Sequence, residues 1–544
     1  TGPSDYPQPQ WTTAALFALA LFTKVEAVGA IGAFWAFDLW QRGRENPVAS
    51  LAASIRASFD RRTLTRLAPV LASAAFYFVI RATVMAQFPF ADARHAPDVG
   101  ASEYLATQLT AWWYYVARWV APVRLVADNI AYPVHRSWLH PVVLLAASGW
   151  IAVGALLAAA WKRAPYLVFL AIAALALLSP TSSVAPLSEM VNEHRPYLAI
   201  AVLSLAAMIP IGTRLRTWPL GAARPALAIS VAIGFLSLGL LTWRRNEVFA
   251  TPASYWQDVI AKAPSARAHL NLGVALMQKN DMTRALREMR RALEFAPEWY
   301  YTHINLGVAY QHTGQLDSAR AYYDRAVQYD RYSGEALTWR AEFRLSQRDF
   351  SGARDDFAAS QTPGLQHYRR AKGLATAYAG LGDVDRALEQ TANLLAIDRA
   401  AALSAIPGIS TPFFGTPMLR AAGRRFYEVL QSRVPGQPWM AENIVRLSDA
   451  PITLASSDTS EAARMARGLD LLYRNKDARG AAEQFRKVLR RNAAHYGATY
   501  QLATALDRAA ESAQARPLWE KVLAMATVHK DAPIATAARA RLAR

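Results

Sequence analysis

Apolar residues are concentrated in the first 243 residues, where several runs approach the length of a membrane-spanning helix. Such a helix needs about 20 apolar residues to cross about 30 Å of hydrocarbon. The first run carries Lys24 and Glu26 near its middle, so it is either one long span or two short helices that meet at 23–26. The pattern predicts about six membrane segments, at 11–40, 67–88, 138–161, 165–178, 197–212 and 225–243.

Basic residues in the connecting loops predict how these segments are oriented. Lys and Arg are retained on the cytoplasmic side of a membrane. The loops on one predicted side hold eleven Lys or Arg residues, whereas the alternate loops, 89–137 and 180–196, hold five. We therefore expect a bacterial inner-membrane protein in which these two loops and everything after Trp243 lie in the periplasm.

The loop 89–137 is not simply polar, because large apolar residues recur in it at helical spacing. The pattern predicts an amphipathic helix that either lies in the membrane interface as an aromatic anchor or packs on the membrane domain as ordinary core. The residues that carry it are Tyr104, Leu105, Leu109, Trp112, Trp113, Val116 and Trp119.

The second half of the chain repeats itself with a period of 34 residues, which is the period of tetratricopeptide repeats. Small residues such as Gly273 and Ala285 are expected to let two antiparallel helices approach closely, and Pro297 to stop the second helix. The positions Leu272, Gly273, Leu276, Ala285, Met289 and Ala292 match Leu306, Gly307, Tyr310, Ala319, Tyr323 and Ala326.

The predicted fold is all-α, with a polytopic helical membrane domain followed by a tetratricopeptide-repeat α-solenoid. We place the membrane domain at 1–243, about four repeats at 244–398 and about two more at 460–544. The Pro- and Gly-rich stretch between them, 399–459, is either a degenerate repeat or a hinge.

Such solenoids bind a peptide or a partner protein along the face made by the first helix of each repeat. Asn271 and Asn305 occupy the same repeat position and are candidate partner-binding residues, although a solvated Asn is equally typical there. His269, His303 and His312 are interpreted as core or surface residues, and no metal site is predicted.

The composition excludes several classes of protein. The 544 residues include no cysteine, which excludes disulfide scaffolds, thiolate metal sites and a Cys nucleophile. The net charge of +19 would suggest a nucleic-acid partner, but a mean hydropathy of +0.06 is high for a soluble basic protein. We therefore interpret the charge as a sign of membrane topology and expect no nucleic-acid partner.

Charged residues within or beside the apolar runs are candidates for function, because an unpaired charge in hydrocarbon is costly. Lys24, Glu26 and Arg81 lie within predicted segments, although Arg81 also suits an interfacial or helix-capping role.

Three consecutive polar residues stand on the outer face just before a predicted span. Glu193, His194 and Arg195 provide a carboxylate, an imidazole and a guanidinium, which together can hold a phosphate and pass a proton. The alternative is a cluster at the start of a helix in the membrane interface.

Three stretches of the chain resemble the bacterial relatives of the transmembrane and tetratricopeptide-repeat O-mannosyltransferases, which are GT-C glycosyltransferases. They are "LFTKVEAVGAIGAFWAFDL", "SSVAPLSEMVNEHRPYLAI" and "RRNEVFATPASYWQDVIAKAPSARAHLNLG". The most specific element is "EHR-x-YL" at 193–198, and "TKVE" at 23–26 is similar to the family's "SKE" pattern.

The resemblance implies transfer of a sugar from a polyprenyl-phosphate donor on the periplasmic face, with repeats that present an acceptor or partner protein. It implies that Lys24 and Arg195 meet the donor phosphate and that Glu193 and His194 line the pocket. The full set of donor-phosphate or pocket candidates is Lys24, Glu26, Glu193, His194, Arg195 and Tyr197.

No catalytic residue is assigned. Enzymes of this class take their catalytic carboxylate from an acidic motif in the first outer loop, and no such loop precedes the first apolar run, where Asp5 is the one acidic residue. The resemblance therefore implies either a further region before residue 1 or a shortened member without catalysis. The alternative function is a non-catalytic, membrane-anchored scaffold whose repeats assemble or stabilise a membrane protein complex.

Overall fold

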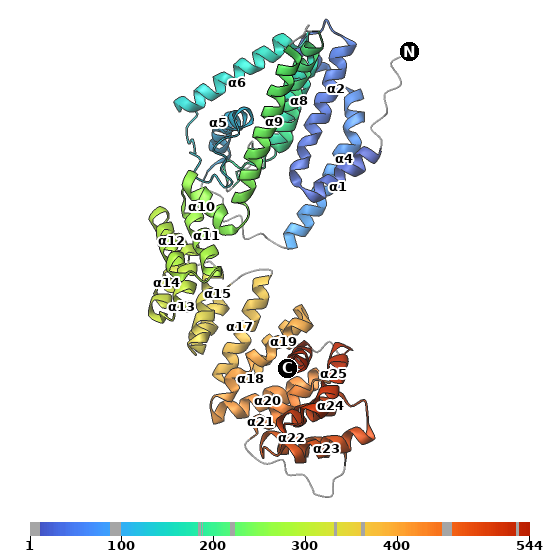
Figure 1. Cartoon of the computed structure of the whole chain (residues 1–544), viewed down its shortest axis with the longest axis vertical. Coiled ribbons are helices and arrows are strands. Elements are labelled where there is room, and N and C mark those ends of the chain that lie inside the picture. Colours follow the sequence, from blue (N-terminus) through green and yellow to red (C-terminus); the bar gives the residue numbers. More distant parts are fainter. Residues whose placement is uncertain are drawn as a thin grey trace. The chain divides into compact units, whose positions relative to one another are not determined.

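A computed structural model describes residues 11–87, 99–182, 186–187, 189–217, 223–330, 334–360, 365–448, 460–528 and 532–543. Within these residues the regular structure is helical, apart from one isolated β-bridge between Asn129 and Val191 (Figure 1). The chain forms two compact units, Thr1–Pro297 and Glu298–Arg544. The all-α prediction is therefore confirmed.

The first unit begins with the apolar helices. They are α1 (Trp11–Thr23), η1 (Val25–Gly29), α2 (Ala30–Glu45), α3 (Leu51–Ala57), α4 (Arg61–Gln87), α5 (Ala101–Val120), α6 (Pro141–Ala160), α7 (Pro165–Leu178), α8 (Tyr197–Thr217) and α9 (Ala223–Val248).

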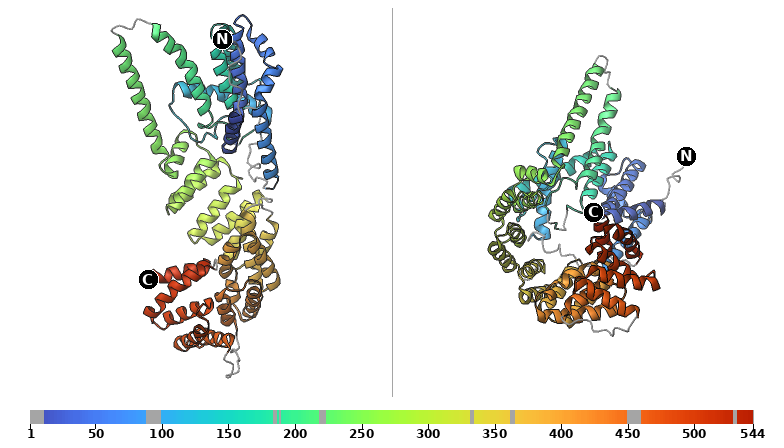
Figure 2. Two further views of the ribbon diagram at one scale, coloured as in Figure 1. Left: turned by 90° about the vertical axis from the view of Figure 1, so that its right-hand side faces the viewer. Right: turned by 60° about the horizontal axis from the view of Figure 1, so that its bottom comes forward.

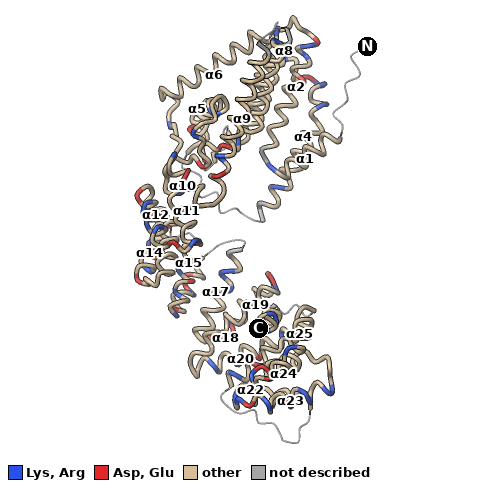
Figure 3. Tube along the Cα trace, viewed as in Figure 1, with Lys and Arg blue, Asp and Glu red and all other residues tan. Residues whose placement is uncertain are grey.

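Four of these helices are long and apolar enough to cross a membrane: Arg61–Val84, Pro141–Ala160, Tyr197–Leu215 and Pro225–Val248. Their surfaces are largely exposed, and in α9 no residue of the most apolar window is buried. Figure 3 shows α6, α8 and α9 almost free of charged residues along their lengths, and Figure 2 shows α8 and α9 extending away from the remaining helices of this unit. This is the surface expected of helices in lipid.

The other two predicted segments form shorter helices. α7 has 14 residues and buries Val168, Leu170 and Ala174 among its neighbours. The first apolar run breaks at Lys24, where the backbone is extended, so that α1 and α2 are separate helices joined by η1. The alternative of one long helix is therefore wrong.

Glycines allow α2 and η1 to lie directly against α7. A Cβ atom on Gly29 would lie 2.4 Å from the carbonyl oxygen of Ala176, and one on Gly32 would lie 2.6 Å from Cβ of the same alanine. Small residues at such contacts are typical of membrane helices, which associate through close packing.

The amphipathic helix predicted in the loop 89–137 is α5. Of the residues that predicted it, Tyr104 is fully buried and packs with Met190 and Val191, and the others are half-buried: Leu105, Leu109, Trp112, Trp113, Val116 and Trp119. Met190 and Val191 belong to the loop 180–196, which together with the loop 89–137 is named an outer loop after its predicted side. The burial of Tyr104 favours packing on the neighbouring helices, and a role as an aromatic anchor in the membrane interface stays a prediction.

The first unit ends with α10 (Pro252–Lys262) and one helix pair, α11 (Ala266–Gln278) and α12 (Met282–Phe295). A Cβ atom on Gly273 would lie 2.6 Å from Met289 and 3.1 Å from the carbonyl oxygen of Ala285, so this glycine is needed for the close approach of the pair.

The second unit continues the series of helix pairs. Its helices are α13 (Tyr300–His312), α14 (Leu316–Tyr329), α15 (Gly334–Ser346), α16 (Phe350–Ala359), α17 (Leu365–Leu381), α18 (Val384–Ile397), α19 (Arg399–Ile409), η3 (Thr411–Phe414), α20 (Pro417–Arg433), α21 (Pro438–Leu447), α22 (Glu461–Tyr473), α23 (Ala478–Arg491), α24 (Tyr496–Arg508), α25 (Ser512–Val528) and α26 (Ala532–Leu542).

The described part of the Pro- and Gly-rich stretch packs with the repeats. Phe413, Phe426, Tyr427 and Trp439 belong to one apolar core that runs from α17 to α26. Shared burial of this kind favours a degenerate repeat over a hinge. Residues 449–459 lie outside the described residues, and the predicted domain boundaries stay a prediction.

Candidate functional site

The outer loop between α7 and α8 contains the predicted Glu-His-Arg cluster, and α5 holds this loop in place. The hydroxyl of Tyr104 donates to the carbonyl oxygen of Thr181 at 2.8 Å. The side-chain amide of Gln108 donates to the carbonyl oxygen of Met190 at 2.9 Å. The backbone N–H of Asn192 donates to the hydroxyl of Tyr115 at 3.1 Å. Polar side chains within an otherwise apolar helix face thus satisfy the backbone of the loop.

Glu193 binds a charged residue at the end of α9. Its carboxylate lies 2.9 Å from the Arg245 guanidinium, which also binds Asp258 of α10 at 2.8 Å. Burial raises the pKa of Glu193 against the opposing effect of Arg245. Its Oε1 is buried and has no hydrogen-bond partner among the described residues. Glu193 therefore connects the loop to α9 and α10.

Arg195 has other partners than this ion pair. The Arg195 guanidinium donates to the carbonyl oxygens of Glu189 and Met190, at 2.8 and 3.4 Å, and so stabilises the backbone of its own loop. His194 is exposed, and Tyr197 begins α8 with 68% of its surface exposed. The three polar residues occupy one loop, yet Glu193 and Arg195 have separate partners, and their phosphate-binding role stays a prediction.

A second ion-pair group joins the outer loops to the first repeat. Arg267 of α11 binds Asp128 at 3.2 Å and Glu189 at 3.0 Å. Asn192 donates to Glu189 at 2.6 Å. Burial raises the pKa of Asp128, although Arg267 opposes the shift. One arginine therefore neutralises carboxylates from both outer loops.

Apolar and backbone contacts support these ion pairs. Thr251 caps α10 and places Pro252 in its first turn, which directs the helix back toward the outer loops. Val259 is fully buried with Ala127, and Lys262 donates to the carbonyl oxygen of Leu125 at 2.9 Å. The start of the repeats is thus fixed to the loop that follows α5 in the same unit.

Lys24 and Glu26 lie at the same end of the membrane helices as this loop. Lys24 is exposed and directly precedes η1, the segment that contains Glu26. Through Gly29, η1 packs on Ala176 in the last turn of α7, three residues before the loop begins. Arg81 lies elsewhere, on α4, where it donates to the hydroxyl of Tyr77 at 3.3 Å.

The candidate residues on the repeats have ordinary helical surroundings. Asn305 is half-buried and donates to the carbonyl oxygen of Tyr301 in its own helix at 2.8 Å, and Asn271 is also half-buried. His269 is buried beside Glu288, as expected of a core histidine. The role of the two asparagines in partner binding stays a prediction.

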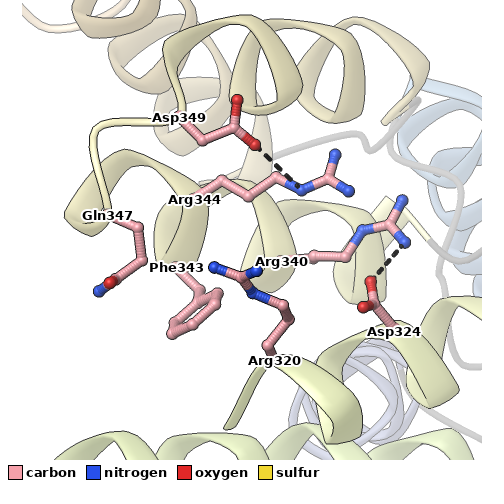
Figure 4. Close-up of a pocket in the computed structure, with 7 residues that line it drawn as sticks. All are labelled: Arg320, Asp324, Arg340, Phe343, Arg344, Gln347 and Asp349. Atoms are coloured by element: carbon pink, nitrogen blue, oxygen red, sulfur yellow. Dashed lines mark hydrogen bonds and ion pairs between the residues drawn. The ribbon is translucent and has the colours of Figure 1, made fainter. Parts of the chain in front are cut away.

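The repeats of the second unit contain a hollow of about 320 Å³ between α14, α15 and the turn before α16 (Figure 4). Phe343 lies at its base and is 3% exposed. Asp349 caps α16 and so fixes the turn at one edge. The lining residues are Arg320, Asp324, Arg340, Phe343, Arg344, Gln347 and Asp349.

Two arginines of this hollow are held by carboxylates. Arg340 binds Asp356 at 2.7 Å and Asp324 at 3.0 Å, and Arg344 binds Asp356 at 3.0 Å. Asp356 is 4% exposed, so both guanidinium groups are bound to a buried carboxylate that does not line the hollow. These pairs leave the two side chains with little freedom to move.

Arg320 differs from the other two. It is exposed and forms no ion pair with any described residue, and Figure 4 shows its side chain beside Phe343 and Arg340 without a bonded carboxylate. With Asp356 included, three aspartates balance the three arginines of the hollow, and Arg320 is the guanidinium among these three that has no ion pair with a described residue. Such a site suits a carboxylate from another molecule.

Sequence reasoning missed the residues that connect the outer loops to the repeats. Arg245 lies 52 residues from Glu193, and no local spacing links them. The sequence did place Arg245 at the end of an apolar run, and a charged residue in that position is expected to form an ion pair. Asp128, Asp258 and Arg267 carried no comparable signal.

Comparison with known proteins identifies the repeats. The tetratricopeptide-repeat family matches residues 238–298 and again 300–333. An uncharacterized protein of Haemophilus influenzae is 26% identical over 121 residues, which cover 22% of this chain and 68% of that protein.

Solved structures include PilF of Pseudomonas aeruginosa, with 16% identity, a TM-score of 0.27, and coverage of 42% of this chain and 92% of that one. PilW, a type IV pilus biogenesis factor, has 15% identity, a TM-score of 0.28, and coverage of 44% and 98%. The family matches and the helix pairs together show that this chain carries tetratricopeptide repeats.

Proposed function

We propose that this protein is a membrane-anchored tetratricopeptide-repeat scaffold that holds an acidic segment of a partner protein. The observation that carries the proposal is the hollow between α14 and α15, in which Arg320 forms no ion pair with a described residue while two further arginines are held rigidly. Tetratricopeptide repeats generally bind protein partners, and four apolar helices supply an anchor.

The chemistry of the hollow favours a carboxylate of the partner. A guanidinium without a bound carboxylate loses little when it binds a new one, whereas Arg340 would first have to release two aspartates. Asp324 and Asp349 at the edges repel a second acidic group placed too close to them. The hollow therefore suits one acidic side chain, or a terminal carboxylate, at a defined position.

The test uses the full chain in detergent micelles and a fluorescein-labelled, C-terminally amidated alanine hexapeptide that carries a single glutamate. We expect saturable binding that Arg320→Ala weakens about tenfold, the loss of roughly one charge-assisted hydrogen bond. Arg325→Ala is the matched control, because Arg325 lies on the same helix but does not line the hollow. Equal binding by both variants, or equal binding of the same peptide with glutamine in place of the glutamate, would contradict the proposal.

A second candidate is sugar transfer from a polyprenyl-phosphate donor on the periplasmic face of a bacterial inner membrane, as the GT-C resemblance implies. It is favoured by the packing of η1, next to Lys24, on the last turn of α7, which brings this segment to the base of the loop that holds Arg195.

The test of this candidate uses the product of the complete gene, with labelled mannose on polyprenyl phosphate as the donor. Arg195→Ala should abolish transfer to membrane proteins, while Lys162→Ala, at the other end of α7, should leave transfer unchanged. If the unmodified protein transfers no sugar, this candidate is wrong and the scaffold remains.

A further inference from the structure

A hollow of about 510 Å³ lies at the end of α2, far along the helix from Lys24, and aromatic rings form its wall. Trp40 stacks on Phe169 of α7 with ring centres 5.7 Å apart, and Phe37 packs edge-on against Phe169 at 5.8 Å. Phe37 is nevertheless 42% exposed. An aromatic wall with an open face is typical of the boundary between hydrocarbon and water.

The position of the hollow agrees with that boundary. A Cβ atom on Gly43, in the same turn of α2, would lie 2.6 Å from Trp161, which directly follows the span Pro141–Ala160. α4, whose span starts at Arg61, is also bound here, because Arg62 forms an ion pair with Glu45 at 3.1 Å. The hollow therefore lies where two candidate spans end.

Two arginines at this end of α2 and α4 are neutralised by a carboxylate, whereas one arginine at the hollow is not. Arg42 and Arg66 both bind Asp38, at 2.9 and 2.7 Å. Arg44 is exposed and pairs with no carboxylate of the described residues; its guanidinium lies over the Trp40 ring, 5.4 Å from the centre. A cation held on an aromatic face keeps its N–H donors available to an anion.

We propose that this hollow binds the headgroup of an anionic phospholipid, with the phosphate on Arg44 and the upper acyl chain against Phe37 and Trp40. Gln41 adds a neutral hydrogen-bonding group to the same wall, and Glu45 is turned to Arg62. The inference rests on the membrane anchor of the proposed function and is independent of the acidic-segment site on the repeats.

Charge complementarity selects this occupant. Lys162 and Arg163 follow the neighbouring span and are exposed, so the surroundings of the hollow are positive. A zwitterionic headgroup would place its own ammonium group beside Arg44. A soluble phosphate would leave the exposed aromatic wall in water, whereas a lipid covers it.

The experiment measures lipid retention by the full chain. The protein is delipidated in detergent, mixed with phosphatidylglycerol or phosphatidylcholine, and examined by native mass spectrometry. We expect at least one retained phosphatidylglycerol and a preference over phosphatidylcholine of about tenfold. Arg44→Ala should remove this preference, and Phe37→Ala should reduce the retention of both lipids.

Arg163→Ala is the matched control, since it removes the same charge from the same end of the helices without touching the hollow. A diazirine-labelled phosphatidylglycerol should crosslink to the peptide 37–45. Three results would overturn the proposal: equal effects of Arg44→Ala and Arg163→Ala, no preference for phosphatidylglycerol, or full displacement of the lipid by glycerol phosphate. None of them bears on peptide binding by Arg320, so the two proposals fail separately.

Discussion

Arg245 connects three parts of the first unit, and its replacement tests whether ion pairs fix the start of the repeats to the outer loop. The guanidinium binds Glu193 and Asp258 at 2.9 and 2.8 Å, and the three side chains are only 15 to 18% exposed. Arg245→Ala leaves the half-buried carboxylate of Glu193 without an ion-pair partner, whereas Asp258 keeps Lys262 at 2.6 Å.

The expected cost is about 3 kcal/mol, the lower end of the range for removing one partner of a buried ion pair, because some solvent reaches the group. If the cost falls on local opening, it raises the population of the open state, and backbone amide hydrogens should exchange roughly a hundredfold faster. The affected peptide should be Pro252–Lys262, which follows the ion pair and carries Asp258.

The assay is hydrogen exchange with mass spectrometry on the full chain in lipid nanodiscs. Arg244→Ala is the control, because Arg244 is the exposed neighbour in the same turn and forms no ion pair with a described residue. A double variant that adds Glu193→Gln should restore most of the protection, since it removes the unpaired charge and leaves the ion pair between Asp258 and Lys262 in place. If exchange in α10 is the same in Arg245→Ala and Arg244→Ala, the ion pairs do not hold this junction.

Three further predictions concern packing and pH. Gly307→Ala should lower the free energy of unfolding by about 1–3 kcal/mol, because the new Cβ would lie 2.8 Å from a tyrosine ring. Gly408→Ala should leave the free energy of unfolding unchanged, because its Cβ meets no atom within 4 Å. Denaturant titration measures both variants. Gly29→Ala should lower the thermal stability of the full chain in detergent, because its Cβ would lie 2.4 Å from a backbone oxygen of α7. Burial raises the pKa of Glu442, so its carboxyl group binds a proton more tightly in the folded state than in the unfolded state. The free energy of unfolding should therefore fall as the pH rises from about 4.5. Glu442→Gln should make the melting temperature less dependent on pH.

Each of these predictions has a result that would contradict it. Equal losses for Gly307→Ala and Gly408→Ala would show that the ring can move aside. An unchanged melting temperature for Gly29→Ala would mean that η1 does not rest on α7. A steeper pH slope for Glu442→Gln would reverse the sign expected from burial.

The spans illustrate what local pattern predicts well. Four of the predicted membrane segments correspond to helices long enough to span, because apolar composition and length depend only on neighbouring residues. The break at Lys24 was left open by the sequence, since hydrophobicity alone does not distinguish a long helix from two short ones. In the structure the backbone is extended at Lys24, and the segment that follows packs against α7 through Gly29 and Gly32.

The candidate site shows the opposite case. Glu193, His194 and Arg195 are adjacent in sequence, which favoured one shared site, but the structure pairs Glu193 with Arg245 and Arg195 with the backbone of its own loop. Adjacent residues of a turn point in different directions, so proximity along the chain does not predict a common partner.

The sequence by itself determined the helical class, the apolar spans and the 34-residue repeat, because each depends on the spacing of side chains along one helix or one helix pair. Only the tertiary structure decided which charges meet. Arg267 binds carboxylates from two outer loops, Arg320 forms no ion pair with a described residue, and Arg44 rests on Trp40. The physical reason is that an ion pair forms wherever folding brings two side chains within about 4 Å, and that distance depends on every helix packed between them.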